Sequence, residues 1–477
     1  MTATMLLTIW TSTLLLGSGI WVVVAGWPRR VADCWCALGG GWIVGASSCG
    51  VLVRVLAAQQ LAAAPVRVGW CAAIIGALCW LFAGWMRRSS VALQAPVVSV
   101  ARRGDRVWIA LLLALLAWRG WVLFDDVLLH PTLPWDAWAV WLGKAKSWVL
   151  AGRIEPSVSY ETWIGHPVAA TRTGVAWMYP ELIPWMAVWM AAGTHWIEPL
   201  VGLLWFGLGV AMLALHYGQW RALGVRPLVA WAGTYALGSI PLLDTHVALG
   251  GYADLWIAAV LSMGAHAWLR WSCLGERRQL GIVVIAMTLL PLLKLEGAVW
   301  SIILGLACLF GLLPRRLQAR RFLIGTGALL VVVVACIAMG LPWTGVARRY
   351  LDTGRFFDFD QIGASAAALA AALWAQWNWN LLWFALPVAL WWNRRRWLQS
   401  RMTRRLAVFV VLPFVVMLGL FLFTSAARYA QSYSAVNRLL LQITPLLVSV
   451  LVLVLRSPDV EESPAVQSAP ESSSAAA

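Results

Sequence analysis

The segment PWDAWAVWLGKAKSW, residues 134–148, stands out as a charged and aromatic stretch in a chain that is mostly apolar. It contains Asp136, Lys144 and Lys146, and only one other lysine, Lys294, occurs among the 36 Lys and Arg residues. A lysine is a compact, strongly hydrated point charge, whereas an arginine is a planar fork. This scarcity favours a specific chemical use for the three lysines, although a genome that prefers arginine codons would leave the same pattern without a function.

Further charged side chains interrupt apolar runs later in the chain. A charge at membrane depth is costly by about 2.5–3.5 kcal/mol and usually marks a site or a water-filled cavity. In LLPLLKLEGAVW, Lys294 and Glu296 either form a local ion pair in a turn or face such a site. In GGYADLWIAAV, Asp254 either caps a helix, where the helix dipole favours a carboxylate, or faces the site as well. Asp244 and His246 lie nearby, so this loop could also hold a divalent metal.

The composition indicates the class of protein that must position these residues. The chain has 477 residues, of which 61% are hydrophobic and 12% are charged, whereas about a quarter are charged in soluble domains. Apolar runs of bilayer-spanning length, roughly 17–25 residues, recur throughout. We therefore predict an all-α integral membrane protein, since a barrel would need short alternating segments. The net charge of +16 does not indicate nucleic-acid binding, because the arginines form short clusters between apolar runs, as in cytoplasmic loops.

The apolar runs predict about thirteen transmembrane helices. They cover residues 4–27, 34–57, 67–86, 107–125, 199–217, 227–243, 254–270, 280–293, 297–313, 322–342, 368–392, 406–424 and 439–455. If the amino terminus lies outside, 23 of the 36 basic residues fall on the inner face and 13 on the outer face, the bias expected for this orientation. Residues 126–198 then form a long outer loop. Within it, residues 179–193 are too short and proline-broken to span, so we predict an interfacial helix on the outer surface.

This topology divides the chain into three parts. Residues 1–106 form amino-terminal accessory transmembrane helices, residues 107–456 form a transmembrane catalytic domain that carries the outer loop, and residues 457–477 form a disordered cytoplasmic tail. The candidate charged residues, including all three lysines, then lie at outer helix ends or in outer loops.

The order of these motifs resembles that of the GT-C superfamily, integral-membrane glycosyltransferases that use polyprenyl-phosphate-linked sugars. The protein mannosyltransferase and lipid A aminoarabinose transferase families belong to it. The stretch PWDAWAVWLGKAKSWVLAGRIEP resembles their first outer loop, and the pair Tyr179–Pro180 resembles the start of their surface helix. Three later motifs also match in order, namely GYAD at 251–254, KLEG at 294–297 and NRLLLQITP at 437–445. The resemblance covers residues from about 107 to 455.

The resemblance implies transfer of a sugar from a polyprenyl-phosphate donor to a lipid, glycan or protein acceptor, at the outer face of the bacterial cytoplasmic (inner) membrane. Such a transfer needs a base for the acceptor proton and cations for the departing phosphate. Asp136 is the candidate catalytic base. The candidate substrate-binding residues are Lys144, Lys146, His166, Asp254, Lys294, Glu296 and Arg438. Asp136 and Asp254 could also share a divalent cation such as Mg²⁺ or Mn²⁺.

Two alternatives stay open. Mannosyltransferases usually carry an acidic doublet at the catalytic position, whereas Asp136 is followed by Ala137, so the earlier doublet Asp125–Asp126 is a second candidate for the base. The chain could also be a transporter or flippase for a lipid-linked sugar or an anionic solute, which would likewise place charges at helix ends near a cavity. The absence of an inverted repeat in the sequence and the gathering of charges on one predicted face favour the transferase. A non-catalytic assembly subunit is a third hypothesis.

Overall fold

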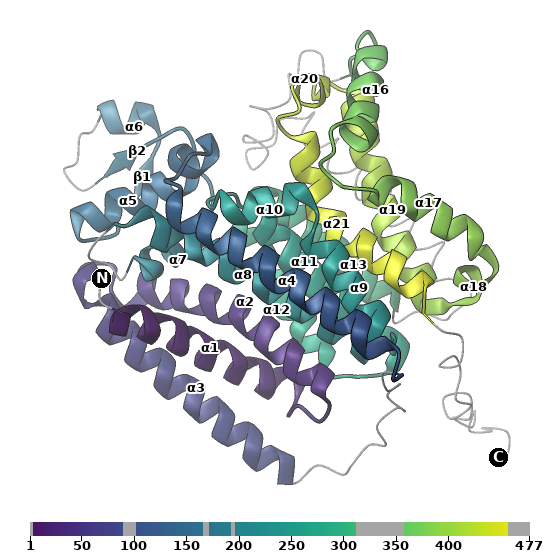
Figure 1. Ribbon diagram of the computed structural model, residues 1–477. Coiled ribbons are helices and arrows are strands. Elements are labelled where there is room, and N and C mark those ends of the chain that lie inside the picture. Colours follow the sequence, from purple (N-terminus) through teal and green to yellow (C-terminus); the bar gives the residue numbers. More distant parts are fainter. Residues whose placement is uncertain (1–2, 89–101, 166–170, 192–195, 312–356, 457–477) are drawn as a thin grey trace, which may run out of the picture.

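The computed structural model describes residues 3–88, 102–165, 171–191, 196–311 and 357–456, which are mostly helical (Figure 1). The longer helices are α1 (Ala3–Ala25), α2 (Val31–Leu56), α3 (Ala64–Arg88), α4 (Asp105–Leu129), α8 (Glu198–Ala222), α11 (Asp254–Leu274), α12 (Gln279–Leu293), α13 (Leu295–Gly311), α19 (Arg401–Phe423) and α21 (Val436–Val454). The shorter elements are the 3₁₀ turn η1 (Leu61–Ala63), the π-helical turns η2 (Ala137–Trp141) and η5 (Ala371–Ala375), the strands β1 (Ser157–Val158) and β2 (Arg172–Thr173), and the helices α5 (Leu142–Ala151), α6 (Tyr160–Gly165), α7 (Leu182–Met190), α9 (Pro227–Gly238), α10 (Pro241–Ala248), α16 (Ile362–Ala370), α17 (Leu382–Trp392), α18 (Arg394–Gln399) and α20 (Ala427–Gln431).

The helix lengths agree with the predicted class, an all-α membrane protein. Seven helical segments within the described ranges are long and apolar enough to cross a bilayer. They begin at Thr4, Val31, Leu61, Asp105, Glu198, Arg401 and Val436. The predicted total of about thirteen spans is not confirmed, and the predicted span 322–342 lies outside the described residues.

Two predicted spans are broken helices. The predicted span 227–243 is divided at Ser239–Ile240, where α9 ends and α10 begins with Pro241. The predicted span 368–392 is divided by residues 376–381, which separate η5 from α17. A proline at the first helical position suits a new helix start, and the polar sequence QWNWN at 376–380 can satisfy backbone groups locally.

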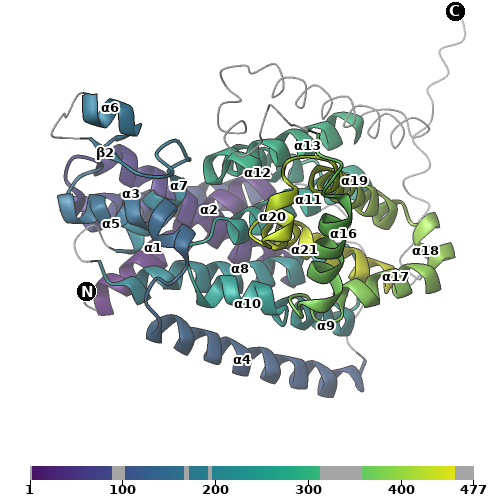
Figure 2. The same cartoon turned by 90° about the horizontal axis from the view of Figure 1, so that it is seen from above.

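Helix α11 forms the centre of the bundle, because every residue from Asp254 to Arg270 is buried. It packs against α12 and α21. The amino-terminal helices α1, α2 and α3 lie side by side (Figure 1), and α2 joins them to the rest of the bundle by packing on α8. Helix α4 runs along one side of the molecule (Figure 2), and no residue of its most apolar stretch is buried, which suits a helix that faces lipid.

The segment between α4 and α8 carries a group of short elements at one end of the bundle (Figure 1). Strands β1 and β2 pair in parallel, with Ser157 opposite Arg172. The helix predicted on the outer surface is α7, whose nine residues span only about 13 Å. That surface position is wrong. All α7 side chains except Trp185 are buried, and Trp189 Nε1 donates to Thr13 Oγ1 of α1 at 2.9 Å. The cause is its sequence, which is apolar on all faces.

Candidate functional site

A buried carboxylate lies where α11, α12 and α21 meet. Asp254 is the first residue of α11 and its side chain is 0% exposed. Its Oδ1 accepts hydrogen bonds from Lys294 Nζ at 2.9 Å and Gln442 Nε2 at 2.7 Å, and its Oδ2 accepts one from Arg438 Nε at 2.8 Å. Charge-assisted bonds of this kind are stronger than neutral ones. The end of α12 and the start of α21 are therefore both fixed to the first residue of α11.

Lys294 reaches Asp254 because the helical conformation is interrupted between α12 and α13. Lys294 has extended backbone angles at the end of α12, and α13 starts at the next residue. A Cβ at Gly297 would lie 1.9 Å from the carbonyl oxygen of Leu290, so only glycine permits this tight passage. Lys294 Nζ also lies 3.1 Å from Oε1 of Glu296, which is partly exposed. The predicted KLEG turn thus supplies a buried cation and a more exposed carboxylate.

Helix α21 contributes Arg438 and Gln442 from a single face. Side chains four residues apart are neighbours on a helix, so both reach Asp254. The Gln442 amide is oriented by Trp300, whose Nε1 donates to Oε1 at 2.6 Å. Sequence reasoning selected Arg438 but missed Gln442, although the four-residue spacing within NRLLLQ was a usable signal.

Arg438 also brings Asp136 to the site. Its Nη2 lies 2.5 Å from Asp136 Oδ2, and its guanidinium lies over the ring of Tyr252, 5.2 Å from the centroid. The approach depends on Gly251, which has φ +120° and where a Cβ would lie 2.2 Å from the Cβ of Ala137. Asp136 is 18% exposed and Arg438 is 23% exposed. The site therefore runs from a fully buried carboxylate to a partly accessible one.

We call these six residues the Asp254 cluster: Asp136, Asp254, Lys294, Glu296, Arg438 and Gln442. Its charged members form an open chain, because Asp136 pairs with Arg438, Arg438 with Asp254, Asp254 with Lys294, and Lys294 with Glu296. The two ends of this chain are carboxylates. Within the described ranges, the Oε2 atom of Glu296 has no hydrogen-bond partner and is itself buried, although the side chain as a whole is partly exposed.

Asp136 precedes the π-helical turn η2, which leads into α5. Such wide turns are rare and are frequently found at functional sites. Trp135 and Trp138 flank Asp136, both are exposed, and their rings meet edge to face at 6.1 Å. Two exposed aromatic rings therefore lie beside Asp136 in the sequence.

The other two lysines lie away from the cluster's carboxylates. Lys144 Nζ donates to the carbonyl oxygens of Trp177 and Tyr179 at 3.2 and 3.4 Å. Burial lowers the pKa of Lys144, and the nearby Glu181 carboxylate partly offsets this. Lys146 Nζ bonds to Oε1 of Glu198 at 2.9 Å. Lys144 thus fastens α5 to the segment before α7, and of the three lysines it is Lys294 that contacts Asp254.

The remaining predicted residues have other surroundings. His166 lies outside the described residues. Asp244 pairs with Arg119 of α4. His246 is buried with its ring 4.6 Å from that of Tyr252, and its Nε2 has no partner within the described ranges.

The shared cation predicted for Asp136 and Asp254 stays a prediction. In the described arrangement the Arg438 guanidinium bonds to both carboxylates. The described residues contain no group of three or more His, Cys, Asp or Glu side chains arranged to hold a metal ion. No protein-family description, curated protein or solved structure matches this chain.

Proposed function

We propose that this protein is a membrane glycosyltransferase that moves a sugar from a polyprenyl-phosphate donor to an acceptor hydroxyl or amine. The open chain of charges in the Asp254 cluster supports this best. Its terminal carboxylates flank two cations, and both termini are more exposed than Asp254. Candidates for a proton acceptor, for phosphate-binding cations and for an acceptor of sugar hydroxyls therefore lie in one cluster, which supports the function that the sequence resemblance implies.

In the proposed reaction, the Asp136 carboxylate takes the proton of the acceptor group while the acceptor atom bonds to the anomeric carbon of the sugar. The bond between that carbon and the phosphate oxygen breaks, and its electron pair leaves with the polyprenyl phosphate. Because phosphate is a good leaving group, cations that stabilise its negative charge replace a strong general acid. Arg438 is the candidate for this role, since the planar guanidinium matches phosphate geometry.

In this proposal, Arg438 makes the protonation of Asp136 depend on binding of the donor phosphate. A guanidinium has five N–H donors, and Arg438 directs Nε at Asp254 and Nη2 at Asp136. A donor phosphate that binds Arg438 competes with Asp136 and frees this carboxylate to accept a proton. Asp254 is fully buried, which favours a positioning role that holds Arg438 and Lys294 over direct contact with the sugar. Glu296, whose side chain is 42% exposed, is the better candidate for a sugar hydroxyl.

The proposed location of the reaction is the outer face of the bacterial inner membrane. The distribution of arginines supports this orientation, because the opposite end carries clusters such as that in α18. The Asp254 cluster uses the start of α11, the end of α12 and the start of α21, which share one end of the bundle.

The test is sugar transfer in membranes incubated with radiolabelled polyprenyl-phosphate sugars. We expect Asp136→Asn to lower the rate by about 10²–10⁴-fold, the usual contribution of a general base. The amide keeps the size of the side chain, so the protein should accumulate as wild type does. Asp125→Asn is the matched control, because Asp125 is exposed on α4. Loss of transfer in the control and retention in Asp136→Asn would assign the base to the earlier doublet, and no transfer by wild type with any donor would refute the proposal.

One observation favours the alternative, a transporter or flippase. The two broken helices face each other at their breaks, where Leu242 N donates to the carbonyl oxygen of Asn378 at 3.1 Å and Asn380 Nδ2 donates to that of Ser239 at 2.7 Å. Discontinuous helices of this kind form substrate sites in transporters. Movement of a labelled lipid-linked sugar across proteoliposomes without acceptor glycosylation would favour this function.

A further inference from the structure

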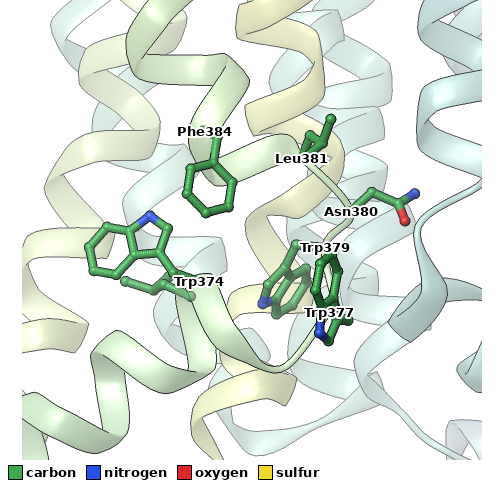
Figure 3. Close-up of a pocket in the computed structure, with 7 residues that line it drawn as sticks. Trp374, Trp377, Trp379, Asn380, Leu381 and Phe384 are labelled. Atoms are coloured by element: carbon green, nitrogen blue, oxygen red, sulfur yellow. The ribbon is translucent and has the colours of Figure 1, made fainter.

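An aromatic cavity lies at the break between η5 and α17 (Figure 3). Its volume is about 280 Å³, and it is lined by Leu373, Trp374, Trp377, Trp379, Asn380, Leu381 and Phe384. In Figure 3, Trp374 and Phe384 lie on one side, and Trp377 and Trp379 on the other. The lining is apolar except for one amide, and the cavity is partly open. Its volume is near the lower limit of roughly 300–1,000 Å³ for small-molecule sites, so it suits part of an extended apolar ligand.

Two residues that line the cavity have left-handed backbone angles, and one of them is a tryptophan, for which this conformation is unfavourable. Trp377 has φ 55° and Asn380 has φ 50°. Asparagine tolerates the left-handed region, but a bulky residue there is a genuine outlier. Trp377 is 80% exposed, so burial of its own ring does not stabilise it there. Strain of this kind clusters at ligand-binding positions, where the side chain has a use that glycine could not supply.

The cavity is adjacent to the Asp254 cluster through a short series of contacts. Gln376, which precedes Trp377, accepts a hydrogen bond through Oε1 from Asn437 Nδ2 at 2.7 Å. Asn437 is followed by Arg438. The wall is fixed by Trp379, which is 1% exposed and donates through Nε1 to the carbonyl oxygen of Ala372 at 2.9 Å. The segment that forms the aromatic cavity is therefore bonded to the residue of α21 that immediately precedes Arg438, the candidate phosphate-binding residue.

We propose that this cavity binds part of the hydrocarbon chain of the lipid-linked sugar donor, whose phosphate lies at Arg438; this rests on the proposed function. The assignment follows from the two chemistries that meet here. An apolar, aromatic cavity selects hydrocarbon, and the adjacent cation selects an anionic head group. A bulk phospholipid chain would fill the cavity without needing Arg438, whereas the donor occupies both and gains from both.

Photolabelling with a diazirine-bearing polyprenyl phosphate that carries no sugar tests the proposal on the full-length protein. We expect wild type to be labelled within residues 373–384, and Trp377→Ala and Trp374→Ala to reduce this labelling about tenfold, as for loss of a central aromatic anchor. Trp118→Ala is the matched control, because Trp118 is exposed on α4, and it should label as wild type does. Unlabelled polyprenyl phosphate should compete, and excess phosphatidylglycerol should not.

Equal labelling of wild type and both cavity variants would overturn the inference, as would equal competition by phosphatidylglycerol. The measurement needs no sugar transfer, so its outcome is separate from that of the proposed function. If the protein is labelled at the cavity but transfers no sugar, the lipid site is supported and the proposed enzymatic function is refuted. If it transfers sugar but is not labelled at the cavity, the enzymatic function is supported and the cavity does not bind the hydrocarbon chain.

Discussion

Helix α11 carries a cluster of charges at each end, and the two clusters are connected differently. At its start is the Asp254 cluster, an open chain that ends in carboxylates. Near its end is a closed ring in which Arg270 pairs with Asp33 and Glu276, and Arg30 pairs with the same two carboxylates. We call Arg30, Asp33, Arg270, Glu276 and the neighbouring Gln219 the Arg270 cluster. Asp254 and Arg270 are sixteen positions apart, which is about 24 Å along the helix.

The difference in connectivity indicates which cluster holds helices together and which one has charges that could take part in a reaction. In the ring, each of the four charges has two partners of opposite sign, so the net charge is zero. The ring joins the α1–α2 connection to the α11–α12 connection. The open chain has three carboxylates and two cations, and its ends have only one cation each within the described part of the protein. A closed ring holds helices together, whereas an open chain keeps capacity for a proton or a ligand.

Removal of the central residue of each cluster should have the largest effect. Arg270→Ala leaves Asp33 and Glu276 with one cation, and Asp254→Ala leaves Lys294 and Arg438 without their shared carboxylate. Breaking a buried ion network by removing one partner costs about 3–5 kcal/mol, because the remaining charges stay buried. We expect both variants to unfold more readily, as measured by thermal unfolding in detergent.

Sugar transfer per folded molecule should distinguish the two variants. Below its unfolding transition, Arg270→Ala should transfer sugar at nearly the wild-type rate, whereas Asp254→Ala should be inactive because Arg438 and Lys294 lose their positions. Asp254→Asn, which keeps the shape of the side chain, is the control for packing. Equal inactivation of the two alanine variants in the folded state would mean that connectivity does not separate their roles.

A smaller effect is expected from the glutamine in each cluster. Gln442 uses both ends of its amide, toward Asp254 and from Trp300. Gln219 accepts from Arg270 Nη1 at 3.3 Å, but its Nε2 has no partner within the described ranges. An unsatisfied buried group costs about 1–3 kcal/mol. Gln442→Leu should therefore lower the free energy of unfolding by about that amount, since it leaves Trp300 Nε1 without an acceptor.

Gln219→Leu is the matched change in the ring, and it should lower the free energy of unfolding less, because only one bond is lost. Chemical denaturation of the two variants side by side measures the difference. A larger loss for Gln219→Leu would show that the ring depends on this amide more than its single bond indicates.

Much of the site could be predicted from the sequence. The motifs GYAD, KLEG and NRLLLQITP lie at the ends of apolar runs, and a topology that puts these ends on one face predicts that Asp254, Lys294 and Arg438 gather there. The structure brings them together. Helix starts were also predictable where a charge interrupts an apolar run, as for Asp254 at the start of α11.

Other features depend on packing, which an apolar pattern does not specify. Hydrophobicity continues through Ser239–Ile240, so one span was predicted where α9 and α10 are separate. Helix α7 is apolar on all faces, a pattern that fits the membrane surface poorly and the protein interior well. Lys144 and Lys146 were grouped with Lys294 by their scarcity, by their shared predicted face and by the family resemblance, and none of these specifies where a side chain points.

Lys146 gives the smallest expected effect and tests that grouping. Its side chain is 48% exposed, and its ammonium pairs with Glu198 outside the Asp254 cluster. Exposed ion pairs contribute about 0–1 kcal/mol, so Lys146→Ala should change thermal stability little. Because Lys294 bonds directly to Asp254, Lys294→Met should abolish transfer, whereas Lys146→Ala should keep it within about twofold of wild type, a difference of under 0.5 kcal/mol. A large loss of transfer in Lys146→Ala without loss of stability would mean that Lys146 contacts the donor, and that the functional site extends along α5 beyond the open chain of charges.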